Sequence, residues 1–103
     1  MKVMMTDFAK QQIRKTARYI NKEFGKTSKD DFLLNVKHTK QLLESNPYLG
    51  PKEPLLANRA SAYRSVVVTH LNKMVYRILE EYIEIVDFWD TRREPENQAK
   101  QTK

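Results

Sequence analysis

The sequence predicts an α+β fold in which a short N-terminal strand and an antiparallel helical hairpin pack on an antiparallel sheet. Three observations lead to this prediction. Apolar residues recur at helical spacing through the N-terminal half. Residues 63–89 are rich in β-branched and aromatic side chains and form three short strand-like runs. A length of 103 residues, 40% of them hydrophobic, suits one domain with a core.

The first 25 residues predict a strand followed by a helix. Residues 1–6 form the strand, and Thr6 or Asp7 can cap the helix because a short oxygen-bearing side chain accepts hydrogen bonds from the free amides of the first turn. Gly25 is well placed to end this helix in a left-handed conformation. The apolar stripe of the helix comprises Ile13, Ala17, Ile20 and Phe24.

A second helix is predicted to end at Asn46, because Pro47 follows and disfavours helical backbone before it. Ser28 and Asp31 resemble a capping box at its start. The connection between the helices is then roughly four residues, so we expect the two helices to lie antiparallel. The apolar stripe of the second helix comprises Phe32, Leu33, Val36, Leu42 and Leu43.

The C-terminal half begins with a loop and continues as strands. Residues 47–58 contain three prolines and a glycine and predict a loop long enough to have a role. Strands are predicted over 63–69, 74–79 and 82–89, joined by short hairpin turns into a three-strand meander. We expect a single domain over residues 1–95 and a flexible polar tail over residues 96–103.

Charge and composition narrow the range of functions. The formal net charge is +6, and residues 54–79 contain four Lys or Arg but no Asp or Glu, which suits a polyanion or an acidic partner. The chain has no cysteine, and its two histidines have no acidic or thiol partner nearby, so we expect neither a metal nor a cofactor. No apolar stretch is long enough to span a membrane, and residues 1–6 are too short for a signal peptide. We therefore expect a cytoplasmic protein.

Several motifs occur in a fixed order along the chain. They are YINKEFG at 19–25, LLESNPYLG at 42–50, AYRSVVV at 62–68, MVYRI at 74–78 and IEIVDFWDTRREP at 83–95. With the order of the predicted elements, these motifs resemble the RelE/ParE toxin superfamily of bacterial type II toxin–antitoxin modules, over residues 2–95. The resemblance implies a small, basic, plasmid-stabilisation-type toxin that inhibits growth and is held inactive in a hetero-oligomer with a cognate antitoxin.

The superfamily contains two mechanisms. RelE-like members cut mRNA at the ribosome without a metal, whereas ParE-like members poison DNA gyrase. RNA cleavage needs cations at the phosphate and groups that transfer protons. The matching residues here would be Arg64, Lys73 and Arg92, with His70 or Tyr76 as a substitute proton donor.

Two features depart from the RelE-like pattern. Val66 stands where such nucleases often have a second lysine, and residues 94–103 contain no Tyr or His for proton transfer. The sequence is therefore closer to the ParE-like members. His70 equally fits a solvent-facing position at a hairpin end.

A surface for the target or the antitoxin is the other role that these residues could have. Arg64 and Arg77 could lie on one open face of the sheet, or they could pair with glutamates such as Glu84 across strands. Trp89 suits either the core or a recognition surface. The candidate binding residues are Arg64, Arg77, Trp89, Asp90, Arg92 and Arg93, whose final arginine pair suits a phosphate or a carboxylate.

Three functions stay open on this basis. The first is a binding toxin of ParE type, whose target is DNA gyrase or another macromolecule. The second is a ribosome-dependent mRNA endonuclease. The third is a degenerate, non-toxic protein that binds an antitoxin. A cognate antitoxin is the expected partner in each, and no membrane partner is expected.

Overall fold

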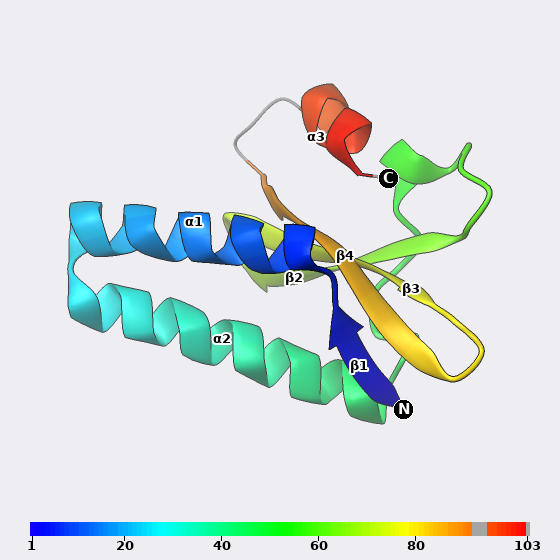
Figure 1. The fold of residues 1–103 in the computed structure, drawn as a ribbon, viewed down its shortest axis with the longest axis horizontal. Helices are drawn as coiled ribbons and strands as arrows, with labels where there is room; N and C mark the ends of the chain where they lie inside the picture. The colour runs from blue at the N-terminus through cyan, green and yellow to red at the C-terminus, as the bar shows by residue number, and fades with distance from the viewer. Residues whose placement is uncertain (92–94, 103) are drawn as a thin grey trace.

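The computed structural model describes residues 1–91 and 95–102. In chain order its elements are β1 (Lys2–Met5), α1 (Asp7–Phe24), α2 (Lys26–Ser45), the short 3-10 helix η1 (Pro54–Leu56), β2 (Tyr63–Thr69), β3 (Asn72–Ile78), β4 (Tyr82–Asp90) and α3 (Pro95–Gln101). The helices α1 and α2 form an antiparallel hairpin against the sheet, and α3 lies beside η1 (Figure 1). The predicted α+β class is confirmed.

The sheet has four strands in the order β1-β4-β3-β2. Strands β2, β3 and β4 form the predicted antiparallel meander. Strand β1 pairs in parallel with β4, with Lys2 opposite Tyr82 and Met5 opposite Ile85, so the sheet as a whole is mixed. A parallel pair needs a long connection, which the helices and the first two strands of the meander provide.

The Thr6 side chain caps the start of α1 by accepting a hydrogen bond from the Ala9 amide at 3.1 Å, as expected.

One glycine makes the turn between the two long helices. Gly25 has a backbone φ of +95°, which residues other than glycine rarely adopt. This single residue ends α1 and directly precedes α2. Helix α2 therefore starts at Lys26 with no side-chain cap, and the predicted capping box at Ser28 is wrong.

The main core lies between the helical hairpin and one face of the sheet. Phe24, at the far end of the hairpin, is 66% exposed although its spacing placed it on the apolar stripe. Phe24 is the last residue of α1, and this end of the helix extends beyond the sheet (Figure 1). The buried residues of this core are Ala9, Ile13, Ala17, Phe32, Val36, Leu43, Met74, Tyr76, Ile83, Ile85 and Phe88.

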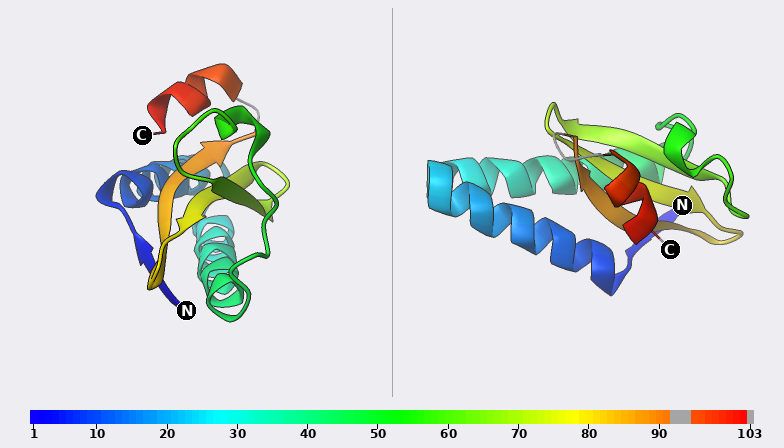
Figure 2. Two further views of the ribbon diagram at one scale, coloured as in Figure 1. Left: turned by 90° about the vertical axis from the view of Figure 1, so that its right-hand side faces the viewer. Right: turned by 90° about the horizontal axis from the view of Figure 1, so that it is seen from above.

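A second, smaller core lies on the opposite face of the sheet. Its buried side chains are Leu56, Tyr63, Val75 and Trp89, and Ala99 of α3 packs against them. The segment that contains η1 and the helix α3 cover this face, while α1 and α2 lie on the other side (Figure 2).

The C-terminal segment differs from the flexible tail that its polar composition predicted. The side chain of Gln98 makes two hydrogen bonds of 2.7 Å with the backbone of Asp90. The Arg59 guanidinium donates to the carbonyls of Ala99 and Thr102 at 2.7 and 3.0 Å. These hydrogen bonds of polar side chains help to hold α3 in place, and a pattern of apolar residues does not record them.

Candidate functional site

The predicted cations of the sheet lie on opposite faces. Arg64 is opposite Tyr76 in the β2–β3 pair, on the face that the helical hairpin covers. Lys73 and Arg77 lie an odd number of positions from Tyr76 along β3, and they therefore lie on the opposite face of the sheet. Lys73 is opposite Trp89 of β4, which belongs to the second core. The single open face on which Arg64 and Arg77 would lie together is therefore not formed.

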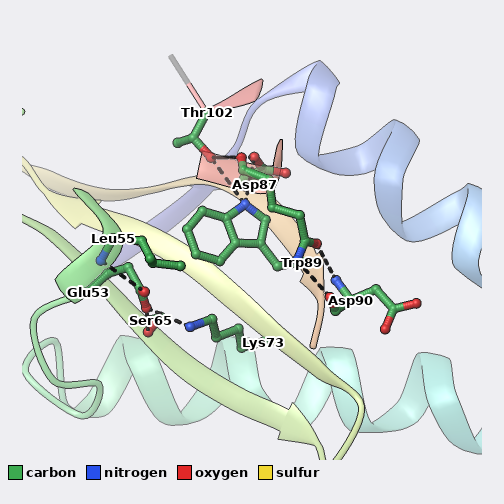
Figure 3. Close-up of polar contacts among 9 residues, drawn as sticks. Glu53, Leu55, Ser65, Lys73, Asp87, Trp89, Asp90 and Thr102 are labelled. Atoms are coloured by element: carbon green, nitrogen blue, oxygen red, sulfur yellow. Dashed lines mark hydrogen bonds and ion pairs between the residues drawn. The ribbon is translucent and has the colours of Figure 1, made fainter. Parts of the chain in front are cut away.

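Lys73 contacts a buried carboxylate. Its Nζ atom lies 2.8 Å from Oε2 of Glu53 and 5.0 Å from the centre of the Trp89 ring (Figure 3). Glu53 is only 3% exposed, and its Oε2 atom also accepts a hydrogen bond of 2.6 Å from the Ser65 hydroxyl. Lys73 thus compensates the charge of an otherwise desolvated acid.

The electrostatics of Glu53 follow from these contacts. Burial of the carboxyl group raises its pKa, but the hydrogen bonds from Lys73 and Ser65 and the positive charge of Lys73 lower it, as does the Leu55 amide. The net result is a pKa below the ordinary value of 4.5. Glu53 is therefore ionised at neutral pH and holds Lys73 by charge.

Arg77 is also paired with an acid. Its guanidinium contacts Oε1 of Glu84 on the neighbouring strand at 2.9 Å and donates to the Ser61 hydroxyl at 3.0 Å. This is the cross-strand pairing that the sequence offered as the alternative to a binding role. Both groups are partly exposed, so the pair stabilises the sheet only modestly.

Arg64 instead fixes the loop that follows α2. It donates a 2.8 Å hydrogen bond to the carbonyl of Gly50, and its guanidinium lies 4.9 Å from the centre of the Tyr48 ring. Residues of the same loop pair with the edge of β2, through a bridge between Lys52 and Arg64. The loop predicted over 47–58 is therefore an ordered cover for the sheet.

Tyr76 holds the same loop from inside the core. Its side chain is fully buried, and its hydroxyl donates to the Pro47 carbonyl at 2.8 Å and accepts from the Gly50 amide at 2.9 Å. Burial raises the pKa of Tyr76 above its ordinary value of 10.0, against the lowering effects of the Gly50 hydrogen bond and the charge of Arg64. A neutral, doubly bonded phenol is poorly suited to donate a proton to a substrate.

Trp89 belongs to the core. It is 0% exposed, and its indole nitrogen donates to Asp87 at 3.0 Å and contacts the Thr102 hydroxyl at 3.1 Å (Figure 3). Asp87 is likewise fully buried and accepts a further hydrogen bond of 2.6 Å from Thr102. In this arrangement Trp89 cannot touch a partner unless α3 moves away.

The C-terminal end of β4, where the sequence singled out Asp90, borders an accessible groove. This groove, of about 390 Å³, lies between α1 and the ends of β3 and β4, and Asp90 lines it. Tyr19 and Phe24 stand at its α1 side as an edge-to-face pair with ring centres 6.5 Å apart. Such partly exposed aromatic rings suit a protein partner.

The remaining predicted residues are a histidine and two arginines. His70 is exposed in the β2–β3 turn, where its carbonyl accepts a hydrogen bond from Thr91. This is the solvent-facing position that the sequence offered as its alternative. Arg92 and Arg93 lie outside the described residues.

Sequence reasoning missed the two buried acids that organise the second face. Glu53 is the only acidic residue between 45 and 79, and Asp87 interrupts an apolar run in β4. Either anomaly could have flagged a buried carboxylate with a partner. Within residues 1–91 and 95–102, no three His, Cys, Asp or Glu side chains are grouped as metal ligands, and no helix there has the length and apolarity to cross a bilayer.

Comparison with known proteins gives one family and several structural neighbours. The family described as the ParE toxin of the type II toxin–antitoxin system parDE matches residues 3–95. No curated protein matches the sequence. A chain of a chromosomal ParDE TA system from P. aeruginosa aligns with a TM-score of 0.72 and 12% identity, covering 87% of this chain and 95% of that one.

Two further solved structures share the fold. The YoeB dimer from Staphylococcus aureus aligns with a TM-score of 0.56 and 17% identity, over 84% of this chain and 92% of that one. The YoeB/ParE toxin from Agrobacterium tumefaciens gives 0.58 and 18%, over 87% and 98%. At these identities the structural likeness establishes the fold alone.

Proposed function

Because this chain belongs to the ParE toxin family of type II toxin–antitoxin systems, we propose that it inhibits bacterial growth by binding a macromolecular target. A cognate antitoxin neutralises it in a hetero-oligomeric complex. DNA gyrase is the first target to test, since the ParE-like members of the superfamily act on it. The proposal also places the protein in the cytoplasm, where that target lies.

The observation that carries the choice of binding over RNA cleavage is that two of the three candidate cations of the sheet, Lys73 and Arg77, are paired with carboxylates. Lys73 contacts Glu53 and Arg77 contacts Glu84, at 2.8 and 2.9 Å. Stabilising the transition state of phosphodiester cleavage requires cations that are free to meet the developing charge. Here a phosphate would have to displace an acid, and in the case of Lys73 that acid is buried.

The proton-transfer groups support the same choice. Tyr76 is enclosed and bonded to two backbone groups, and its raised pKa opposes ionisation. His70 is exposed in the turn between β2 and β3. The enclosed position of Tyr76 supports binding over a mechanism that needs a general acid.

The test is induced expression in bacterial cells that contain no antitoxin. Growth, the 5′ ends of mRNA and the supercoiling of a reporter plasmid are recorded in the same culture. Val75→Asp provides the unfolded control, because Val75 is fully buried and a carboxylate there has no partner.

We expect growth arrest with intact mRNA and altered plasmid supercoiling, and no arrest with the control. New mRNA ends within codons would instead establish the endonuclease function. Undisturbed growth in cells that contain folded protein would mean a degenerate, non-toxic chain. Arrest with unchanged mRNA and unchanged supercoiling would keep the binding function but exclude gyrase.

A further inference from the structure

The helix α3 is attached to the second core mainly by polar contacts. Of its side chains that the structure describes, Ala99 alone packs against the apolar residues there. The side chain of Gln98 bonds the backbone of Asp90 twice, and Arg59 donates to the carbonyls of Ala99 and Thr102. The net contribution of such bonds to stability is modest, because water replaces them when the groups separate. The helix can therefore detach more easily than an element that is held by a large apolar surface.

The polar groups beneath α3 would keep partners in such an open state. Asp87 is 0% exposed, and its carboxylate accepts hydrogen bonds from the side chains of Gln101 and Thr102. It also accepts from the Phe88 amide at 2.8 Å and from the Trp89 indole at 3.0 Å, and both of these donors belong to β4 (Figure 3). When α3 leaves, water can replace the first two donors while the last two stay. The sheet therefore needs no rearrangement to accommodate the open state.

Detachment of α3 would uncover the single tryptophan of the chain. Trp89 is 0% exposed and lies in the second core with Leu56 and Val75. Lys73 lies 5.0 Å from the centre of its ring, so the indole is held in place on a strand of the sheet. Binding energy between proteins is often concentrated on such a rigid aromatic side chain.

The same detachment would release Arg59. Its guanidinium donates to two carbonyls of the C-terminal segment, and it has no ion pair with any residue that the structure describes. A carboxylate of a partner can take the place of these carbonyls, because the planar guanidinium suits it. Ala99 connects the two features, since its carbonyl lies on Arg59 and its side chain packs on the core that contains Trp89. The apolar and cationic parts of the uncovered surface are therefore neighbours.

We propose that α3 is an autoinhibitory segment, whose release exposes Trp89 and Arg59 as the surface that contacts the target. The inference rests on the proposed function, since the target is the macromolecule whose binding arrests growth. The surface fits a protein that presents an apolar pocket beside a carboxylate. A nucleic acid fits it less well, because Glu53 neutralises Lys73, the cation next to the indole.

The release of α3 is measured in the full chain through its single tryptophan. Two double-checked observables report the access of solvent to the indole, namely quenching of its fluorescence by acrylamide and hydrogen exchange of its N–H group followed by NMR. The opened variant combines Gln98→Ala with Gln101→Ala, which removes hydrogen bonds to Asp90 and Asp87 but none to the indole. Alanine favours helix, so the change weakens the attachment of α3 rather than the helix itself.

Lys100→Ala is the matched control, because Lys100 lies on the same helix and is exposed. We expect the indole N–H to exchange at least about tenfold faster in the opened variant, and to change less than about twofold in the control. Circular dichroism melting curves verify that both variants are folded.

Growth at graded levels of induction gives the functional readout, with the amount of folded protein measured in each culture. We expect the opened variant to arrest growth at a level at least about threefold lower than the wild-type chain, because more of the protein is competent to bind. In the opened variant, Arg59→Gln should remove this gain. Lys52→Gln makes the same change of charge at an exposed position of the same segment between α2 and β2, and it should retain the gain.

Three results would overturn the proposal. In the first, the tryptophan of the opened variant stays as protected as in the wild-type chain, so α3 is a fixed part of the fold. In the second, the opened variant exposes its tryptophan but arrests growth no more strongly. In the third, Arg59→Gln and Lys52→Gln remove the gain equally, which would indicate a polyanion attracted by net charge as the target instead.

The two readouts separate this inference from the proposed function. If neither the wild-type chain nor the opened variant arrests growth although the opened variant exposes Trp89, the toxin function is wrong, and the inhibitory role of α3 is wrong with it. If the wild-type chain arrests growth and the opened variant is no stronger, the toxin function is retained and only the inhibitory role of α3 is wrong.

Discussion

Removing one hydroxyl group in the core, by Tyr76→Phe, should loosen the loop between α2 and η1. The hydroxyl bonds to the Gly50 amide and the Pro47 carbonyl, at 2.9 and 2.8 Å. Phenylalanine preserves the ring but leaves a buried N–H and a partly buried carbonyl without a partner. An unsatisfied buried group costs about 1–3 kcal/mol, and the less buried carbonyl costs less, so we expect a total of about 2–4 kcal/mol.

Urea and thermal denaturation measure this loss. For a domain of this size, each kcal/mol corresponds to about 4–8 °C in the melting temperature, so we expect the melting temperature to fall by about 10–25 °C. Tyr48→Phe is the matched control, because Tyr48 is 67% exposed. Its effect should stay within about 0.5 kcal/mol. A loss of less than about 1 kcal/mol for Tyr76→Phe would refute the role assigned to the hydroxyl.

The pH dependence of the same variant offers an independent check. The pKa of Tyr76 is raised in the folded protein, so its contribution to stability is fully present below the unfolded value of 10.0 and is lost as pH rises through the folded pKa. The wild-type protein should therefore lose stability in alkaline solution by up to about 1.4 kcal/mol per pH unit from this group. Tyr76→Phe should lack this part of the decline, and identical alkaline curves would contradict the reasoning.

Three other changes have expected outcomes. Folding lowers the pKa of Glu53, so its contribution to the free energy of unfolding is present above pH 4.5 and is lost as the pH falls through the folded pKa. In acid, the urea midpoint of Glu53→Gln should therefore decline less steeply with falling pH than that of the wild-type protein. Parallel curves for the two proteins would contradict this expectation. Gln98→Ala removes two of the hydrogen bonds that attach α3 to β4 and should cost about 1–3 kcal/mol. The emission of the single tryptophan should shift to the red, whereas an unchanged spectrum would show that α3 stays in place. Gly50→Ala would put a β-carbon against the backbone carbonyl of Ser65, so the free energy of unfolding in urea denaturation should fall by more than about 3 kcal/mol. Gly25→Ala is a milder comparison, because its β-carbon meets open space although its φ is unfavourable.

The sequence predicted those features that depend on neighbouring residues. The spacing of Ile13 and Ala17 identified α1, and the β-branched run at 66–68 identified β2, because periodicity and propensity are local. The parallel pairing of β1 depends on the position of β4, which is distant in the sequence. The pattern of neighbouring residues does not predict this position. The helix α3 was missed for a related reason, since Gln98 is held by the backbone of a strand rather than by an apolar stripe.

The candidate site shows the same division. The resemblance to known toxins directed attention to Lys73, and the alternation of basic and apolar residues along the strand directed attention to Arg77. Both residues lie in β3, an inner strand of the sheet. Their charge partners could not be assigned in the same way. Glu53 reaches Lys73 from a loop 20 positions earlier in the chain, and only the packing of that loop on β2 brings the two together.

The position of β4 in the sheet has a consequence for how the protein is made. This strand lies between β1 and β3, yet it is the last strand to be synthesised. While a ribosome is still translating, α1 and β1 lack the strand that they contact, so the sheet can close only after residues 82–90 have emerged. A chain that stops before residue 82 therefore lacks the strand that joins β1 to β3 and cannot form the four-stranded sheet.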